Sequence, residues 1–424
     1  MIPDKRFEIM VDYAYSRVPL YMKRLVKYTS GMPWENIPVL TKDEIQSDSE
    51  SFFSSEYLVG GNREDILHGR TSGSTGRYMD LYCHRNDNTK SLLTVWLYRK
   101  KYYGITPADK MCYFFTSSNI GYRDGIEYES EATGNIKGFS KNNLAHDRMI
   151  EIYREIEEFA PVWMFIQPSM AVLLCDAAKE TGIKLENLRY IEFTGEMLTD
   201  SVRKRTEETF DCKCANHYGC NEVNTIAFEC PYGNMHIASN MVYVETLDDS
   251  DCRTMYGEEG RIIVTSVANR VMPYIRYDIG DRGVLRDDIK CRCGCQSPVL
   301  ELTGGRVHEY IETADGQKIN AYIFVHAVEM INRELEGCVR QFSIVQTDYD
   351  RFDVKMAVDD EIYEMGVDEE AIEERFMRNV IHPGMENAEY RFEFCNQIFQ
   401  EEGRKVLWFR KCIKTGENLY GENN

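Results

Sequence analysis

The sequence predicts an α/β protein: a large N-terminal domain of mostly parallel sheets flanked by helices, with a β-subdomain, and a small mobile α+β C-terminal domain. Three observations support this prediction. Short apolar runs alternate with amphipathic helical stretches over residues 111–216, the pattern of repeated βα units. The helical period disappears over residues 235–286, which favours antiparallel strands. Beyond Gly305 a hairpin precedes an αββαβ order, which is typical of a separate small α+β domain.

We expect the N-terminal domain over residues 1–304, with its β-subdomain at about 230–300, and the C-terminal domain over 305–424. The paired glycines Gly304 and Gly305 mark the boundary, because they can serve as a hinge. In the first domain we expect helices at 7–27, 146–159, 169–179 and 200–210, and strands at 111–116, 162–166, 190–193, 213–216, 242–246 and 260–265. In the second we expect helices at 322–335 and 369–380, and strands at 310–313, 317–320, 341–346, 352–357 and 389–394.

The composition excludes several classes of partner. Lys and Arg number 50 against 70 Asp and Glu, a formal charge of -20, which argues against a nucleic-acid surface and against binding to anionic membranes. No apolar run approaches the ~20 residues that span a bilayer, and the N-terminus has no apolar signal core. We therefore expect a cytoplasmic protein. A homodimer is compatible with the sequence, which does not define the oligomeric state.

One loop has the composition of a phosphate-binding site. It reads Thr71-Ser72-Gly73-Ser74-Thr75-Gly76, four hydroxyl side chains and two glycines in six residues. Glycine lets the backbone approach a ligand closely, and each hydroxyl and peptide N–H adds a donor for a polyphosphate. The loop is not the P-loop of kinases and GTPases, because no Lys follows its second glycine. A Ser/Gly turn between strands is the alternative interpretation.

A second polar cluster begins where the strand expected at 213–216 ends. It contains Tyr218, Gly219, Asn221 and Glu222. The Tyr218 ring can stack on a base, the Asn221 amide can donate to a phosphate, and the Glu222 carboxylate can hold Mg²⁺ against phosphate oxygens. An ordinary polar loop is the alternative.

Two further segments follow expected strands. Tyr277-Asp278-Ile279-Gly280-Asp281 ends with a carboxylate just after a glycine, an arrangement that presents Asp281 to ribose hydroxyls. An Asx-type turn is equally compatible with it. The segment Thr194-Gly195-Glu196 offers backbone that can line an adenine, or it is a helix-entry loop.

Taken in register, these elements resemble the adenylate-forming superfamily of acyl-CoA synthetases, adenylation domains and luciferases, and most closely the phenylacetate-coenzyme A ligases. The resemblance covers roughly residues 70 to 410. The motifs that carry it are Thr71 to Gly76, Tyr218-Gly219-Cys220-Asn221-Glu222, Tyr277 to Asp281 and Gly305-Arg306. Phosphoryl transfer needs charge neutralisation and alignment more than covalent help from the protein, and these residue types suit that requirement.

The resemblance implies a reaction. A carboxylic acid, for this subgroup an aryl or arylacetic acid, would react with ATP to give an acyl-adenylate and pyrophosphate. Transfer to coenzyme A would follow.

The resemblance also implies roles for single residues. In this mapping Glu222 holds Mg²⁺, Asp281 binds the ribose, Arg306 lies near ribose or phosphate, and Lys405 bridges the carboxylate and the α-phosphate. A basic pair on an exposed strand is the alternative for Arg404 and Lys405. The aromatic run Tyr113-Phe114-Phe115 either lines the acid pocket or belongs to the core.

Two rival functions stay open. One is an adenylating enzyme that loads a carrier protein or forms an amide, and the other is a non-catalytic nucleotide-binding protein. The sequence departs from the family pattern in ways that bear on this choice: Asn221 replaces the common Thr or Ser, Arg77 stands near a usual Lys, and Val307-His308-Glu309 occupies the hinge position. These departures bear on the rate and on the second half-reaction more than on nucleotide binding.

Cysteine spacing predicts a metal site. The chain has 14 cysteines, and in a cytoplasmic protein they are not expected to form a disulfide framework. Cys230 with His236, and Cys291 with Cys293, form two knuckles in the β-subdomain, and Cys₃His is an accepted set for structural Zn²⁺. Cys295 is left as a spare. Reduced, unligated thiols are the alternative.

Overall fold

The computed structural model describes part of the 424-residue chain. The described residues are 3–24, 28–58, 65–70, 79–115, 122–123, 126–127, 130–140, 146–304, 310–314, 316, 318–335, 338–359, 361–364, 366–380, 385, 387–396, 398 and 408–413. The chain divides into two compact units. The first comprises Met1–Leu198 and Thr206–Arg306, and the second comprises Val307–Asn424 together with Thr199–Arg205.

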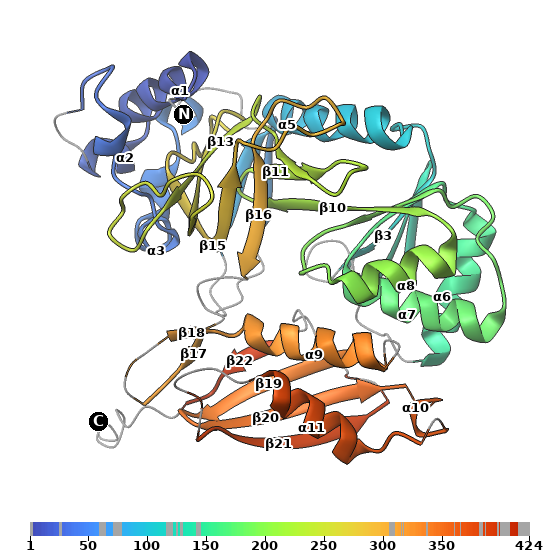
Figure 1. Ribbon diagram of the computed structural model, residues 1–424. Helices are drawn as coiled ribbons and strands as arrows, with labels where there is room; N and C mark the ends of the chain where they lie inside the picture. Colours follow the sequence, from blue (N-terminus) through green and yellow to red (C-terminus); the bar gives the residue numbers. More distant parts are fainter. Residues whose placement is uncertain are drawn as a thin grey trace, which may run out of the picture. The chain divides into compact units, whose positions relative to one another are not determined.

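The first unit is built on a mixed sheet of 12 strands (Figure 1). In spatial order the strands are β13 (Val242–Leu247), β14 (Glu259–Ser266), β15 (Tyr277–Arg286), β16 (Val299–Gly304), β12 (Met235–Ile237), β11 (Asn224–Glu229), β10 (Lys213–Cys220), β9 (Tyr190–Phe193), β8 (Trp163–Ile166), β3 (Met111–Phe115), β7 (Ile136–Ser140) and β6 (Ser130–Thr133). The pairs from β10 to β7 are parallel and all other pairs are antiparallel. Strand β10 therefore joins the parallel part to the β-subdomain.

Helices cover both faces of the parallel part. They are α5 (Arg85–Tyr98), with the π-helical turn η4 (Arg99–Tyr103), and α6 (His146–Phe159), α7 (Pro168–Thr181) and α8 (Asp200–Phe210). Because side chains alternate along a strand, Met164 packs with α6 and α7, while its neighbour Trp163 packs with α5. Figure 1 shows α6, α7 and α8 gathered on one side of this sheet.

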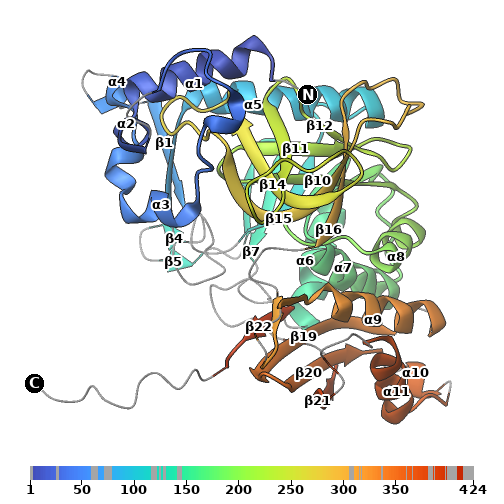
Figure 2. The ribbon, with the colours of Figure 1, turned by 60° about the vertical axis from the view of Figure 1, so that its left-hand side comes forward.

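The N-terminal segment packs on the antiparallel part. Its elements are α1 (Lys5–Arg17), α2 (Pro19–Arg24), η1 (Trp34–Asn36), α3 (Lys42–Ser47), η2 (Ser49–Phe52), α4 (Ser55–Leu58) and a ribbon of β1 (Ile66–Arg70) with β2 (Asp80–His84). Apolar residues of α1, α2 and α3 share one core with β13 to β16. Figure 2 shows α1, α2 and α3 beside β14 and β15. A further short ribbon pairs β4 (Tyr122–Arg123) with β5 (Ile126–Glu127).

The second unit has its own sheet and core. Its sheet has the order β21 (Glu389–Cys395), β20 (Arg351–Val358), β19 (Val339–Asp348) and β22 (Phe409–Lys411), and its hairpin pairs β17 (Tyr310–Glu312) with β18 (Lys318–Asn320). Its helices are α9 (Tyr322–Glu334), α10 (Glu361–Glu364) and α11 (Glu369–Asn379). Phe324 of α9, Phe376 of α11 and Phe352 of β20 lie at the centre of the core and are essentially inaccessible.

The fold class predicted from the sequence is confirmed, and the structure adds elements that were not expected, among them α5, β12, β15 and β16. The helix expected over residues 7–27 is two helices, because Val18 precedes Pro19 and adopts an extended conformation that ends α1. Strand β10 continues to Cys220 rather than ending at Asn216. The large sheet is mixed, since the β-subdomain strands extend the parallel sheet through β10. Among the described residues, no helix has the length and apolar character of a membrane span.

Candidate active site

A tight hairpin carries the Tyr218 to Glu222 element. Strands β10 and β11 pair antiparallel, with Asn221 and Glu222 in the turn between them. A Cβ atom added to Gly219 would lie 2.2 Å from the backbone oxygen of Asn224. Glycine is therefore required here for the close approach of two backbones within the hairpin, which is a structural reason that the sequence motif alone does not reveal.

A bulge in β15 carries Asp281. The segment Tyr277 to Asp281 was expected to follow a strand, and it is instead the first half of β15. Asp278 pairs with Ile263 and Arg282 with Arg261, so Ile279, Gly280 and Asp281 lie opposite Ile262 alone. Gly280 has a φ of 82°, a left-handed conformation that favours glycine. The amide of Gly280 donates to Asp278 Oδ1 at 2.9 Å, and Arg261 Nη1 donates to the other oxygen of Asp278 at 2.5 Å. These bonds hold the bulge that presents Asp281.

Two hydrogen bonds join these elements. Tyr218 Oη donates to Asp281 Oδ2 at 2.7 Å, and Tyr277 Oη donates to Glu222 Oε1 at 3.2 Å. All four side chains are buried or half-buried. The structure therefore brings together two segments that lie about 60 residues apart and that the sequence analysis assigned to one nucleotide site.

The environment of Glu222 makes its neighbours resistant to ionisation. Burial, and then the charge of Glu222, raise the pKa of the Cys220 thiol well above its ordinary value. The same two causes raise the pKa of Tyr277. Cys220 is therefore a protonated thiol rather than a nucleophile, and Tyr277 keeps the proton with which it donates to Glu222.

A buried ion network lies beside the hairpin. Arg99 of η4 donates to Glu192 of β9 through Nε at 2.7 Å and Nη2 at 2.6 Å, and Glu192 has no exposed surface. His217 Nδ1 lies 2.8 Å from Glu192 Oε1, and its Nε2 lies 2.9 Å from Thr225 Oγ1. Burial by itself would raise the pKa of Glu192, but the charge and hydrogen bonds of Arg99, aided by His217, lower it to about 2.

Sequence reasoning missed Arg99 and Glu192 as members of the site's surroundings. A signal was present, because Glu192 is the one charged residue of the apolar strand 190–193. A buried carboxylate needs a partner. His217 makes hydrogen bonds to Glu192 and Thr225, and its ring contacts Phe165 and Phe228.

The loop after β9 is anchored by Glu196. Its two carboxylate oxygens accept from the amide of Ser169 at 3.0 Å and from Ser169 Oγ at 2.9 Å, at the start of α7. Gly195 is exposed beside it. The loop therefore has a defined position, while its predicted contact with an adenine stays a prediction.

Several predicted residues lie outside the described part of the chain. They are Thr71, Ser72, Gly73, Ser74, Thr75, Gly76, Arg77, Arg306, His308, Arg404 and Lys405. Their predicted roles in phosphate binding, at the hinge and in the first half-reaction stay predictions.

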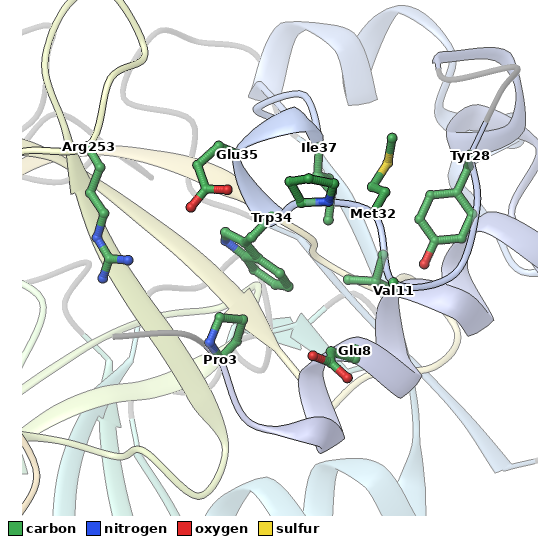
Figure 3. A pocket seen from close by; sticks show the side chains of 11 residues that line it. Pro3, Glu8, Val11, Tyr28, Met32, Trp34, Glu35, Ile37 and Arg253 are labelled. Atoms are coloured by element: carbon green, nitrogen blue, oxygen red, sulfur yellow. The ribbon is translucent and has the colours of Figure 1, made fainter.

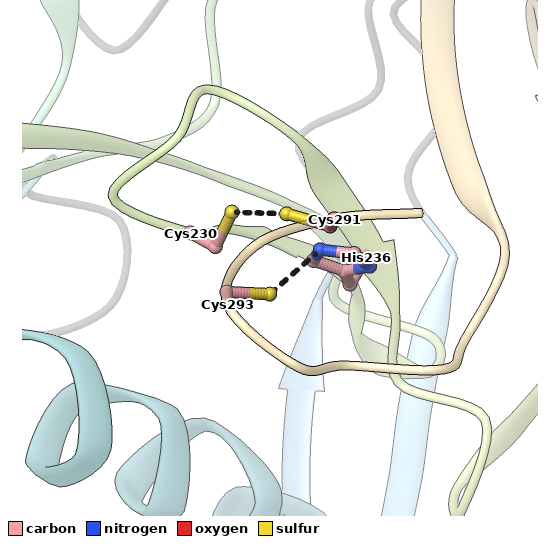
Figure 4. A group of neighbouring side chains, drawn as sticks. All are labelled: Cys230, His236, Cys291 and Cys293. Carbon is pink, nitrogen blue, oxygen red and sulfur yellow. Dashed lines mark hydrogen bonds between the residues drawn. The ribbon is translucent and has the colours of Figure 1, made fainter. Parts of the chain in front are cut away.

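The predicted metal ligands are neighbours. One ligand atom each from Cys230, His236, Cys291 and Cys293 lies within 4.8 Å of every other (Figure 4). All 14 cysteines lie in the described part of the chain, and none of them forms a disulfide. The four side chains come from two segments about 60 residues apart. Cys230 and His236 lie in the turn after β11 and on β12, and Cys291 and Cys293 lie in the connection from β15 to β16.

A cavity of about 270 Å³ lies elsewhere in the first unit. It is lined by α1, by the chain after α2 and by Arg253, with Trp34 near its centre (Figure 3). Within the described part of the chain, its lining includes none of the predicted nucleotide-site residues. We therefore assign it no part in the site.

The fold is that of the adenylate-forming enzymes, as the motifs indicated. No family model matches the chain. The chain is 20% identical to CapK of Staphylococcus aureus over 97% of this chain and 89% of CapK. It is 25% identical to phenylacetate-coenzyme A ligase of Thermus thermophilus over 69% of this chain and 67% of that enzyme. The crystal structure of 2-hydroxyisobutyryl-CoA ligase with R3-HIB-AMP, in the postadenylation state, superposes with a TM-score of 0.75 at 17% identity, covering 96% of this chain and 88% of that one.

Proposed function

We propose that this protein activates a carboxylic acid as its adenylate at the expense of ATP and then transfers the acyl group to coenzyme A. The observation that carries the proposal is the pair of hydrogen bonds that joins Tyr218 to Asp281 and Tyr277 to Glu222. They join an aromatic ring and two carboxylates, the groups assigned to base, ribose and magnesium, from the β10–β11 hairpin and from β15 of the same sheet. The similarity to phenylacetate-coenzyme A ligase supports the same activity.

The first half-reaction forms one bond and breaks one. A carboxylate oxygen of the acid attacks the α-phosphorus of ATP, and the bond from that phosphorus to the bridging oxygen breaks, so that pyrophosphate leaves. No base is needed, since the acid is already ionised. The requirement is to offset the repulsion between two anions and to align them.

The proposed roles follow the chemistry of each side chain. Asp281 accepts from the ribose hydroxyls, since a carboxylate is an acceptor with two oxygens and the bulge in β15 presents it. Glu222 would coordinate Mg²⁺, which would neutralise charge on the phosphates. Lys405 bridges the acid and the α-phosphate. Arg306 is assigned a position near the ribose or phosphate. The remaining nucleotide contacts are assigned to backbone, hydroxyl and amide groups of Thr71, Ser72, Gly73, Ser74, Thr75, Gly76, Gly195, Gly219 and Asn221.

The second half-reaction replaces AMP with a thiol. The sulfur of coenzyme A attacks the acyl carbonyl carbon, and AMP leaves with the electrons of the acyl–oxygen bond. A carrier-protein thiol or an amine would react in the same way, so the acceptor must be identified by experiment.

We propose an aryl or arylacetic acid as the substrate. Strand alternation separates the aromatic run of β3: Phe114 packs with Phe139 in the core, while Tyr113 and Phe115 lie on the opposite face with ring centroids 5.9 Å apart. Two aromatic rings at the carboxyl end of a parallel strand are suited to a flat apolar acid. Phe114 is thus a core residue, and the two others are pocket candidates.

The test is acid-dependent exchange of labelled pyrophosphate into ATP over a panel of arylacetic, benzoic, short aliphatic and amino acids. Acids that support exchange are then incubated with coenzyme A, and with amines, to identify the acceptor. We expect exchange with an aryl or arylacetic acid and a thioester product. An aliphatic or amino acid as the best substrate would contradict the proposed specificity, and an amide product would contradict the proposed acceptor.

A lysine comparison tests the enzymatic proposal against a binding-only protein. Lys405→Ala should abolish exchange while ATP binding, measured by calorimetry, stays within a few-fold of wild type. Lys411→Ala is the matched control, because Lys411 is an exposed lysine of β22 whose partner is Glu312 at 3.4 Å. If wild-type protein binds ATP and no acid elicits exchange, the chain is a nucleotide-binding protein without turnover. Loss of exchange in Arg404→Ala rather than Lys405→Ala would assign the role to Arg404.

A further inference from the structure

We propose that Cys230, His236, Cys291 and Cys293 bind one structural Zn²⁺ ion that fastens the connection between β15 and β16 to the turn between β11 and β12. The proposal is independent of the adenylation activity. It concerns the stability of the β-subdomain, and its test uses no substrate.

The ligand atoms lie near the spacing of a coordination sphere, all within 4.8 Å of one another. Cys230 Sγ and Cys291 Sγ lie 3.6 Å apart, and Cys293 Sγ lies 3.2 Å from His236 Nε2. In a tetrahedral site with Zn–S of ~2.3 Å and Zn–N of ~2.0 Å, neighbouring ligand atoms are separated by about 3.5–3.8 Å. The sulfur separation is also far longer than the ~2.05 Å of a disulfide. Figure 4 shows the four side chains converging from two segments of the backbone.

The backbone forms two matching turns at the cysteines. The amide of Gly233 donates to the carbonyl of Cys230 at 2.9 Å, and the amide of Gly294 donates to the carbonyl of Cys291 at 3.2 Å. Each turn thus begins at a cysteine and closes three residues later. His236 follows the first turn on β12, where it pairs with Val299 of β16. Paired strands therefore hold the two halves of the cluster in register before any ion binds.

The second ring nitrogen of His236 is already engaged. Its Nδ1 lies 3.2 Å from the carbonyl oxygen of Ser297, which can only accept a hydrogen bond. A neutral imidazole that donates from Nδ1 presents the Nε2 lone pair, and Nε2 is the atom that faces Cys293. His236 is 1% exposed, so the buried ring needs both contacts.

Donors also surround the sulfur atoms. Asn234 Nδ2 lies 3.3 Å from Cys291 Sγ, and Cys293 Sγ is approached by the amide of Cys295 at 3.4 Å and by Tyr102 Oη at 3.5 Å. Hydrogen bonds to sulfur stabilise the thiolate form that binds metal. Tyr102 belongs to η4, so the cluster also touches the element that carries Arg99.

The donor set selects the ion and its role. Three thiolates and one imidazole in a tetrahedral arrangement favour Zn²⁺ over Mg²⁺ or Ca²⁺, which prefer oxygen ligands. Four protein ligands leave no position for water or substrate, which is the property of structural rather than catalytic zinc. Cys230 and His236 are each 1% exposed, while Cys291 and Cys293 are partly exposed, so the site is closed to solvent on the side of β11 and β12.

The experiment measures zinc in the purified full-length protein by elemental analysis and by metal release with a thiol-blocking mercurial. We expect about one zinc per chain. Each ligand is then replaced singly, in Cys230→Ser, Cys291→Ser, Cys293→Ser and His236→Gln. After dialysis against a chelator, each variant should contain at most about one tenth of the zinc of the wild-type protein. The matched controls are Cys295→Ser, which alters the spare thiol of the same loop, and Cys252→Ser, an exposed cysteine outside the cluster. Both should keep their zinc.

A measurement on wild-type protein guards against variants that fail to fold. Replacement of zinc by Co²⁺ should give the sulfur-to-cobalt charge-transfer band and the intense visible bands of a tetrahedral S₃N site. Folded wild-type protein that contains no zinc and takes up neither ion would overturn the proposal, as would a Cys230–Cys291 disulfide found by peptide mass mapping. Loss of zinc in Cys295→Ser with retention in Cys293→Ser would overturn the ligand assignment.

Discussion

The hydroxyl of Tyr218 on β10 donates a 2.7 Å hydrogen bond to Asp281 on β15. The two residues are separated by 63 positions in the sequence and by β11, β12 and β16 in the order of the sheet. Their contact follows from the bulge at Gly280, which carries Asp281 out of the regular ladder. Tyr277 and Glu222 form a second link between the same two segments.

Asp281→Asn tests the proposed ribose contact. The amide is similar in size but uncharged, and a hydrogen bond to a charged group contributes about 1.5–3 kcal/mol. We expect kcat/KM for ATP in pyrophosphate exchange to fall by about 10- to 150-fold. Asp249→Asn is the control, because Asp249 is a surface carboxylate, 85% exposed, paired with Arg282. Equal kinetics for Asp281→Asn and wild type would remove Asp281 from the site.

Glu222→Gln tests the proposed magnesium contact. An amide oxygen is a weaker ligand for a hard cation than a carboxylate, so the Mg²⁺ concentration for half-maximal exchange should rise at least about tenfold. The measurement is a magnesium titration at fixed total ATP. Glu258→Gln is the control, since Glu258 accepts from the amide of Met255 in an exposed turn. An unchanged magnesium requirement in Glu222→Gln would exclude the role.

Gly219→Ala tests the hairpin that positions Tyr218 and Glu222. The new methyl group would lie 2.2 Å from the carbonyl oxygen of Asn224, so the strands must separate. We expect a loss of about 1–3 kcal/mol in the free energy of unfolding, measured by urea denaturation, together with reduced exchange activity. Gly69→Ala in β1 is the control, because a Cβ atom there meets nothing within 4 Å. A Gly219→Ala protein as stable as wild type would contradict the packing argument.

Glu192 makes stability depend on acid pH in a defined direction. Its folded pKa of about 2 lies below the ordinary value of 4.5, so the unfolded state binds the proton more readily. The stabilising contribution of Glu192 is therefore complete above pH 4.5 and is lost as the pH falls toward about 2. We expect Glu192→Gln to lack this part of the acid dependence in thermal melts recorded between these two pH values.

The same variant should be unstable at neutral pH. Glu192→Gln leaves Arg99 buried without its counter-charge, which costs about 3–5 kcal/mol. Replacing both residues, as Arg99→Met with Glu192→Leu, should recover part of that loss, because no unpaired charge remains. A Glu192→Gln protein that matches wild type in urea denaturation at pH 7 would show that the ion pair is not stabilising.

Local patterns predicted most of the regular elements. The helix expected over residues 146–159 is α6 with the same bounds, because Met149, Ile152, Tyr153 and Ile156 recur at helical spacing and all four are buried. The hairpin around Gly316, the helices α9 and α11 and the strands β19, β20 and β21 were predicted to within a few residues for the same reason, whereas α10 and β22 were not predicted.

Local patterns could not predict contacts between strands. The expected strand ended at Asn216, yet β10 continues to Cys220. It does so because the polar residues at its end form an antiparallel pair with β11. The bulge at Asp281 depends on register with β14, and the partner of Glu192 lies 93 residues away on η4. Backbone hydrogen bonds between strands and burial of charge are properties of neighbours in space.

The sequence by itself determined the fold class and the chemical types gathered in its motifs, because periodicity and turn chemistry act within a few residues of one another. It also identified the four metal-ligand candidates from their spacing. Only the tertiary structure decided that Tyr218 meets Asp281, that Arg99 neutralises Glu192 and that the four candidate ligands converge. Each of those contacts joins segments far apart in the chain, and only the packing of the folded sheet brings them within hydrogen-bonding or coordination distance.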